Sequence, residues 1–207
     1  MEAQTIKTNG LKFTVILCMV ITVAGCSVSN NPQRSQFRQL QKGIVKEDTS
    51  FIYALPFQKD QKHLVVQGYF SRFSHKERAA LDFKMKKGTP VYAARGGVVV
   101  RVKEDGNKGG WNKKYRQYGN VIVIQHEDGS RAGYWHLRYN GALVNAGDTV
   151  KQGQQIGLSG KTGYTLFPHL HFIVWRFNNN QWLQVATRFK TSGGIRYLRP
   201  LRRYQYH

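Results

Sequence analysis

The chain has 207 residues, 41% of them hydrophobic, which is enough to bury a proper core in a single domain. Lys and Arg number 32 against 11 Asp and Glu, and the resulting net charge of +21 should draw the chain to a polyanion or an anionic surface. Because the cations are spread along the chain and form no recognisable nucleic-acid-binding motif, we expect no nucleic-acid partner.

Residues 1–25 have the pattern of an export signal. Lys7 and Lys12 precede an apolar run over residues 13–24, which is shorter than the roughly 20 residues that a membrane-spanning helix needs. Small residues then lead to Cys26, as in a bacterial lipobox, where the signal is cut before a cysteine that carries the lipid. We therefore predict a lipoprotein signal peptide and a membrane anchor at Cys26. An ordinary secretory signal with a chance cysteine is the alternative.

Residues 26–50 are predicted to be a flexible tether because they are polar, with a short helical patch around residues 36–42 that Gly43 would end. Ser27 follows the predicted lipidated cysteine, whereas Asp at that position usually marks retention in the inner membrane of Gram-negative bacteria. The expected location is therefore the cell envelope, in the outer membrane facing the periplasm if the host is Gram-negative. Cys18 would leave with the signal, so no disulfide is expected.

Residues 51–190 are predicted to form one all-β domain with a sandwich-like antiparallel sheet. Short apolar runs are separated by Gly and Pro, and no long stretch has helical periodicity. The runs lie at residues 64–66, 98–102, 121–124, 133–137 and 172–175. His126 ends one of these runs at an Asp-Gly hairpin turn, which favours a structural role. His63 and His207 match no motif and are expected on the surface.

Two further segments leave alternatives open. Residues 104–117 are a long, glycine-rich, cationic insertion between two predicted strands, and such loops are usually either functional or disordered. Residues 191–207 are a basic, aromatic tail. This tail would either pack on the domain or lie against a polyanion.

His169 and His171 are the most informative residues of the chain. Strand residues two apart point the same way, with Cα atoms roughly 6.5–7 Å apart, so both imidazoles can reach one metal and its water. The pair alone is a weak signal, because two polar residues on the exposed face of an edge strand give the same pattern. Asp82 adds to it, because an unpaired carboxylate between Leu81 and Phe83 would be costly to bury.

Several blocks around these residues occur together and in one order. They are residues 74–83, 88–94, 96–100, 133–137, 147–157 and 162–172. From about residue 64 to residue 175 the chain resembles the LytM/lysostaphin-type metallopeptidases, peptidase family M23. The resemblance implies a Zn²⁺ site with His75, Asp82 and His171 as the ligands. It also implies that His136 and His169 are the catalytic pair beside the reacting water.

The sequence departs from the family pattern at two positions. Six residues separate His75 from Asp82 where three are commoner, and Phe167 stands where Gly is usual. Seven positions of continuous strand would put His75 and Asp82 on opposite faces of the sheet. Residues 76–80 must therefore form a turn or bulge that brings both side chains to the metal.

The resemblance further implies a zinc endopeptidase that hydrolyses peptide bonds in the stems or cross-links of peptidoglycan. Its substrate would lie in an open groove, with Trp111 and Tyr115 of the insertion in contact with it, although a merely flexible hairpin loop is an alternative. Some relatives keep the fold, lose their ligands and activate other wall hydrolases. A non-catalytic regulator is therefore the alternative function, although this sequence retains the whole ligand set.

Overall fold

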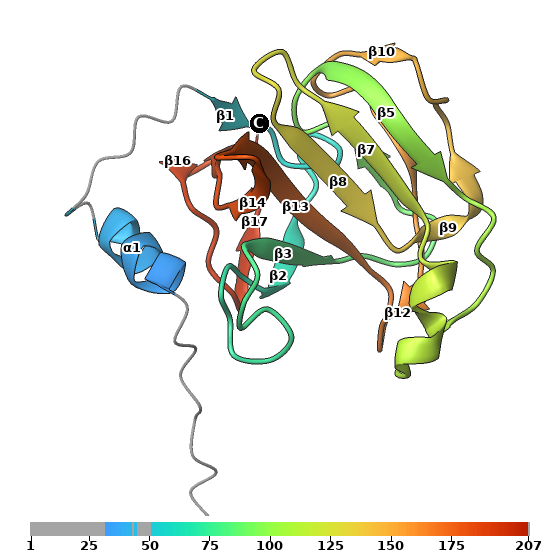
Figure 1. Ribbon diagram of the computed structural model, residues 1–207, viewed down its shortest axis with the longest axis horizontal. Helices are drawn as coiled ribbons and strands as arrows, with labels where there is room; N and C mark the ends of the chain where they lie inside the picture. The colour runs from blue at the N-terminus through green and yellow to red at the C-terminus, as the bar shows by residue number, and fades with distance from the viewer. Residues whose placement is uncertain (1–31, 43, 45–50, 207) are drawn as a thin grey trace, which may run out of the picture.

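A large antiparallel sheet dominates the computed structural model, which describes residues 32–42, 44 and 51–206 (Figure 1). Its strands are hydrogen-bonded in the order β10-β5-β7-β8-β13-β3-β2-β17, and β14 pairs with the C-terminal half of β13. The strands are β10 (Thr149–Val150), β5 (Gly97–Lys103), β7 (Val121–Gln125), β8 (Arg131–Trp135), β13 (His169–Asn178), β3 (Ala80–Lys84), β2 (His63–Gln67), β17 (Arg202–Tyr204) and β14 (Gln181–Val185). The prediction of an all-β domain is confirmed.

Smaller sheets complete the domain. The first is antiparallel and contains β4 (Pro90–Tyr92), β11 (Gln155–Ser159) and β9 (Leu137–Ala142). The second contains β1 (Ile52–Tyr53), β15 (Arg188–Thr191) and β16 (Gly194–Arg196), and the third contains β6 (Gly109–Gly110) and β12 (Gly163–Tyr164). The pairs β1–β15 and β6–β12 are parallel, so the domain is not purely antiparallel as the sequence predicted.

The central strands β3 and β13 are covered on both faces. Leu81 and Phe83 of β3, with Leu170 and Phe172 of β13, are 0–1% exposed and belong to the hydrophobic core. Because side chains alternate along a strand, the intervening residues point to the opposite face. That opposite face carries Asp82 and both histidines of the His169-Leu170-His171 motif, and these side chains are also buried. One face of this strand pair therefore stabilises the fold, and the other presents the polar residues.

The one α-helix of residues 32–42, 44 and 51–206 is α1 (Pro32–Gln41), which begins with a proline at a position that tolerates one. Phe37 of this helix is 6% exposed, and its ring lies 5.2 Å from that of Tyr69, 6.0 Å from that of Phe70 and 5.3 Å from that of Tyr197. The helical patch predicted around residues 36–42 is part of α1, and the aromatic cluster packs this segment of the predicted flexible tether on the domain. In the described part of the chain, no helix has the length and apolar character needed to cross a membrane. Cys26 lies outside the described residues.

The basic tail packs on the domain, which decides between the two alternatives that its sequence left open. β16 pairs with β15, and β17 pairs with β2 at the edge of the large sheet. Leu198, between these strands, is completely buried in the core. Residues 191–206 therefore belong to the same folded unit as the predicted domain.

The insertion at residues 104–117 has regular structure rather than the form of a flexible hairpin loop. It contains β6 and leads into the 3₁₀ helix η1 (Lys113–Tyr118), whose first turn is capped by Asn112. A Cβ on Gly109 would lie 1.8 Å from the carbonyl oxygen of Lys161, so only glycine allows this close approach of the two backbones. The insertion is thereby held beside β12.

Candidate metal centre

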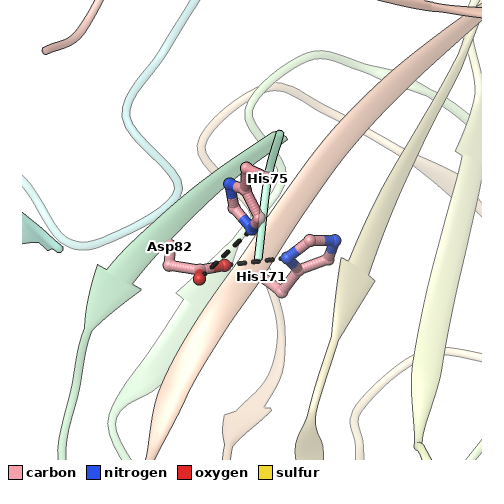
Figure 2. Close-up of side chains that lie close together, drawn as sticks. All are labelled: His75, Asp82 and His171. Atoms are coloured by element: carbon pink, nitrogen blue, oxygen red, sulfur yellow. Dashed lines mark hydrogen bonds and ion pairs between the residues drawn. The ribbon is translucent and has the colours of Figure 1, made fainter. Parts of the chain in front are cut away.

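His75, Asp82 and His171 form a compact cluster on the polar face of β3 and β13 (Figure 2). Asp82 and His171 stand opposite each other in the antiparallel register, and Nδ1 of His171 lies 2.7 Å from Oδ1 of Asp82. Nε2 of His75 lies 3.3 Å from Oδ2 of the same carboxylate. The ligand atoms of the three residues all lie within 4.8 Å of one another.

His75 reaches this cluster from the loop that precedes β3. The backbone N–H of Arg78 donates to the carbonyl of His75 over 3.0 Å, which folds the chain into a turn. The Nδ1 atom of His75 lies 2.9 Å from the carbonyl oxygen of Ala80 and 3.3 Å from that of Gly68. The predicted turn over residues 76–80 is confirmed, and it brings His75 and Asp82 together despite the six residues between them.

The donor set of this cluster fits zinc. Because Nδ1 of His75 donates to a backbone carbonyl, the lone pair of its Nε2 is left for a metal. Ligand atoms of tetrahedral zinc lie about 3.4 Å apart when the bonds are about 2.0–2.1 Å long, and the 3.3 Å between His75 Nε2 and Asp82 Oδ2 matches that separation. Gln67 donates from Nε2 to Oδ2 of Asp82 over 2.7 Å, which orients the carboxylate. Two imidazoles and one carboxylate form a set of three protein ligands typical of catalytic zinc.

His136 and His169 lie beside the triad, with ring centroids 4.7 Å apart. The backbone of His136 is in the left-handed region (φ 66°), and this residue separates β8 from β9. Residues with such strained backbones cluster at functional sites. Nδ1 of His136 lies 2.7 Å from the carbonyl oxygen of Thr162, and Nδ1 of His169 lies 2.9 Å from that of Phe167. Since each Nδ1 donates to a carbonyl, each Nε2 is left as a proton acceptor. In His169 this atom lies 3.5 Å from Asp82 Oδ1.

The electrostatics of the cluster are centred on Asp82. Burial works to raise the pKa of Asp82, but the three imidazoles of His169, His171 and His75 beside its oxygens outweigh burial and hold its pKa well below the usual value. Burial lowers the pKa of His136 to about 3, and burial also lowers the pKa of His171 despite the neighbouring carboxylate. Burial also works to lower the pKa of His169, but the attraction of the Asp82 carboxylate is stronger and raises that pKa. Asp82 is therefore ionised, and His136 and His171 are neutral, at neutral pH.

The five polar residues lie in a groove with a volume of about 570 Å³. Its aromatic lining consists of Phe73, Trp111, Trp135, Tyr164, Phe167 and Trp175. The structure thus brings Trp111 of the insertion to the groove. It does not bring Tyr115 there, because the ring of Tyr115 packs over Gly110 and lies 6.4 Å from the ring of Tyr118.

The other described histidines lie outside the metal centre. His126 is 3% exposed, and its Nδ1 lies 2.8 Å from the carbonyl oxygen of Gly96. His63 is only partly buried, and its two ring nitrogens lie near the carbonyl oxygen of Lys84 and Oε1 of Gln61. His63 is therefore not fully solvated as predicted, because its ring forms a hydrogen bond to the neighbouring strand.

Sequence reasoning missed the groups that orient the five polar residues. Gln67 positions Asp82 across a β-bulge between β2 and β3, and no local pattern marks a glutamine for that role. Thr162 and Phe167 act through their backbone carbonyls, which every residue has. Their contribution follows from strand register and loop path, and these are tertiary properties.

Comparison with known proteins agrees with this geometry. The sequence model of peptidase family M23 matches residues 76–184. Peptidoglycan DD-endopeptidase ShyA of Vibrio cholerae serotype O1 is 44% identical over 91 residues, which are 44% of this chain and 18% of ShyA. Lysostaphin of Staphylococcus simulans is 41% identical over 116 residues, which are 55% of this chain and 21% of lysostaphin. The chain thus spans about a fifth of the length of these curated relatives.

A solved structure of the catalytic domain of lysostaphin from Staphylococcus simulans has 35% sequence identity and a TM-score of 0.41, and the match covers 60% of this chain and 87% of that domain. The match to the family model extends over more than half of the chain and takes in Asp82, His136, His169 and His171, and it begins one residue after His75. The chain belongs to peptidase family M23.

Proposed function

We propose that this chain is a zinc-dependent endopeptidase that hydrolyses peptide bonds in the stems or cross-links of peptidoglycan. One observation carries the proposal: three residues able to hold a metal ion and two further imidazoles line one open groove. The relatives support the substrate class, since ShyA is a peptidoglycan DD-endopeptidase and lysostaphin an antimicrobial peptidase.

The roles of the side chains follow from their positions. His75, Asp82 and His171 would hold the zinc ion, which would supply Lewis acidity for a peptide carbonyl and lower the pKa of bound water. His136 and His169 each direct Nε2 into the site, since their Nδ1 atoms are engaged by backbone carbonyls. This pair orients the attacking water, stabilises the oxyanion that develops on the carbonyl, and passes a proton to the leaving amine.

The proposal is tested with the purified full chain. Metal analysis should find about one zinc per chain, and digestion of purified peptidoglycan should release fragments whose new amino and carboxyl ends mass spectrometry can identify. His169→Ala should abolish the release, whereas His63→Ala, outside the groove, should leave it unchanged. A zinc-loaded chain that cuts nothing but speeds up a second wall hydrolase would instead be a regulator.

The chain is further proposed to be a lipoprotein anchored at Cys26. The apolar run before that cysteine and the polar residues after it support this location. Stable attachment requires more than one acyl chain, because a single chain binds membranes only reversibly. Cys26→Ser should block processing or release the protein from the membrane fraction. Unchanged cleavage and unchanged sedimentation with membranes would leave a secreted enzyme that is not lipid-anchored.

A further inference from the structure

Two arginines give the groove a positive lining beyond the metal centre. Arg78 lies in the loop that carries His75, and Arg116 lies in η1 of the insertion. The only carboxylate among the groove residues is Asp82, which is already engaged by three imidazoles and by Gln67. A bound zinc ion would add two further positive charges next to it. The groove therefore has an excess of positive charge that no groove residue compensates.

Neither guanidinium has a carboxylate partner among residues 32–42, 44 and 51–206. Arg95, in contrast, is buried and paired with Asp128 over 3.1 Å. A fully buried arginine requires such a partner, whereas an exposed one does not. Arg78 and Arg116 are both exposed and face the groove, so their donors are available to a ligand.

Contacts hold the side chain of Arg116 and the backbone of Arg78 in place. The guanidinium of Arg116 lies 5.6 Å from the ring centroid of Tyr164, which stacks on Trp111 at 5.1 Å. Trp111 in turn stacks on Phe73 at 5.5 Å with an interplanar angle of 11°. The backbone of Arg78 is fixed at two points, since its N–H donates to His75 and its carbonyl accepts from Phe70. A positioned guanidinium, as in Arg116, loses less entropy when it binds a ligand.

From this arrangement we infer that the groove selects peptides with free carboxylates next to the cleaved bond over uncharged peptides such as oligoglycine. A guanidinium matches a carboxylate with two parallel hydrogen bonds. A positively charged cleft also concentrates anions before they dock. This inference rests on the proposed function and adds the charge class of the substrate, with Arg78 and Arg116 as the residues that determine it.

The test compares two forms of one synthetic cross-linked stem peptide, with free carboxylates and with those carboxylates amidated. For the wild-type chain, kcat/KM should be at least about tenfold higher for the free acid, and the preference should fall as salt rises. Arg78→Gln and Arg116→Gln should each reduce the preference by slowing cleavage of the free acid alone. Arg101→Gln removes an exposed cation of β5 that lies outside the groove and should leave the preference unchanged.

Failure of this inference differs from failure of the proposed function. Equal kcat/KM for the two forms would overturn the selection of carboxylates while leaving the endopeptidase intact. If the chain cuts neither form of the peptide and does not cut peptidoglycan, the proposed function is wrong. The selection of carboxylates is then tested by the binding of the two peptides instead of their cleavage. Quenching of the fluorescence of Trp111 gives the affinity of each form of the peptide. The signal is assigned to Trp111 because it should be absent in Trp111→Phe. Equal affinities would overturn the inference.

Discussion

Asp82 organises the metal centre at the scale of single residues, because three imidazoles and one amide approach its two oxygens. Among the three imidazoles, that of His171 lies closest to the carboxylate, with Nδ1 2.7 Å from Oδ1. His171→Ala should abolish both stoichiometric zinc and activity, since two protein ligands are too few for a catalytic zinc site. Metal analysis by mass spectrometry checks this, with His63→Ala as the control that keeps its zinc. Full zinc occupancy in His171→Ala would remove His171 from the ligand set.

His136 should separate metal binding from catalysis. Its Nδ1 donates to the carbonyl oxygen of Thr162, and its ring centroid lies 5.8 Å from that of His171. His136 therefore lies outside the triad of candidate metal ligands. His136→Ala should therefore retain zinc, yet turn over about 10²-fold more slowly, as expected for loss of an acid–base or oxyanion group. Zinc content and kcat are measured on the same sample. Loss of zinc in parallel with kcat would make His136 a ligand instead.

His126 should make stability depend on pH. Burial, with a smaller effect of Arg95, lowers its pKa from 6.5 to about 4, so between these values the unfolded chain binds more protons than the folded chain. The stabilisation from the neutral imidazole is complete above pH 6.5 and is lost as the pH falls towards 4, by about 3 kcal/mol in all.

Denaturant unfolding across this pH range measures the effect on the free energy of unfolding. His126→Leu removes the titrating group, so the slope of unfolding free energy against pH should flatten. The absolute stability is a poorer readout, because the variant also loses the hydrogen bond to Gly96. An unchanged slope would assign the pH dependence to other groups.

At the scale of elements, α1 supports the loop that carries His75. Phe37 packs on Tyr69 and Phe70, and Gly68, next to Tyr69, accepts from the imidazole of His75. Phe37→Ala should leave a cavity and loosen this loop, so the affinity for zinc should fall several-fold while the sheet stays folded. Competition with a chelator of known affinity measures it. Ile44→Ala, at a residue that is 70% exposed, is the control. Identical zinc affinity in Phe37→Ala would mean that the helix does not support the site.

Elements with strong local patterns could be predicted from the sequence. The apolar runs that became β2, β5, β7, β8 and β13 alternate or contain many β-branched residues, so the all-β fold could be read from them. The triad could be predicted because its residues stand in a specific arrangement of motifs. The packing of Phe37 and of the tail could not, since both depend on contacts between segments far apart in the sequence. The position of Tyr115 outside the groove lining could not be predicted for a similar reason, because the turn into η1 decides which aromatic ring faces the groove.

At the scale of the whole molecule, the basic tail should be part of the cooperative unit. Leu198 is completely buried, whereas Leu201, three residues later, is 78% exposed. Leu198→Ala should lower the free energy of unfolding by about 2–5 kcal/mol, and Leu201→Ala should change it little. Denaturant unfolding monitored by fluorescence compares the two. Equal stability of both variants would show that the tail is dispensable for folding.

The pairing of β1 with β15 and of β2 with β17 also determines when the fold can form. Residues 52–53 find their partners at 188–189, and residues 63–65 find theirs at 202–204, so both pairings close loops of more than 130 residues. Long-range pairings of this kind form slowly, because closing a long loop lowers the chain entropy before the contacts between the strands can offset that loss. In a nascent chain whose residues after about 187 are still inside the ribosome, β1 would lack its partner β15, and β2 would be paired with β3 but not with β17. The β1–β15 pair and the β17 edge of the large sheet would therefore form only after residues 188–204 have emerged.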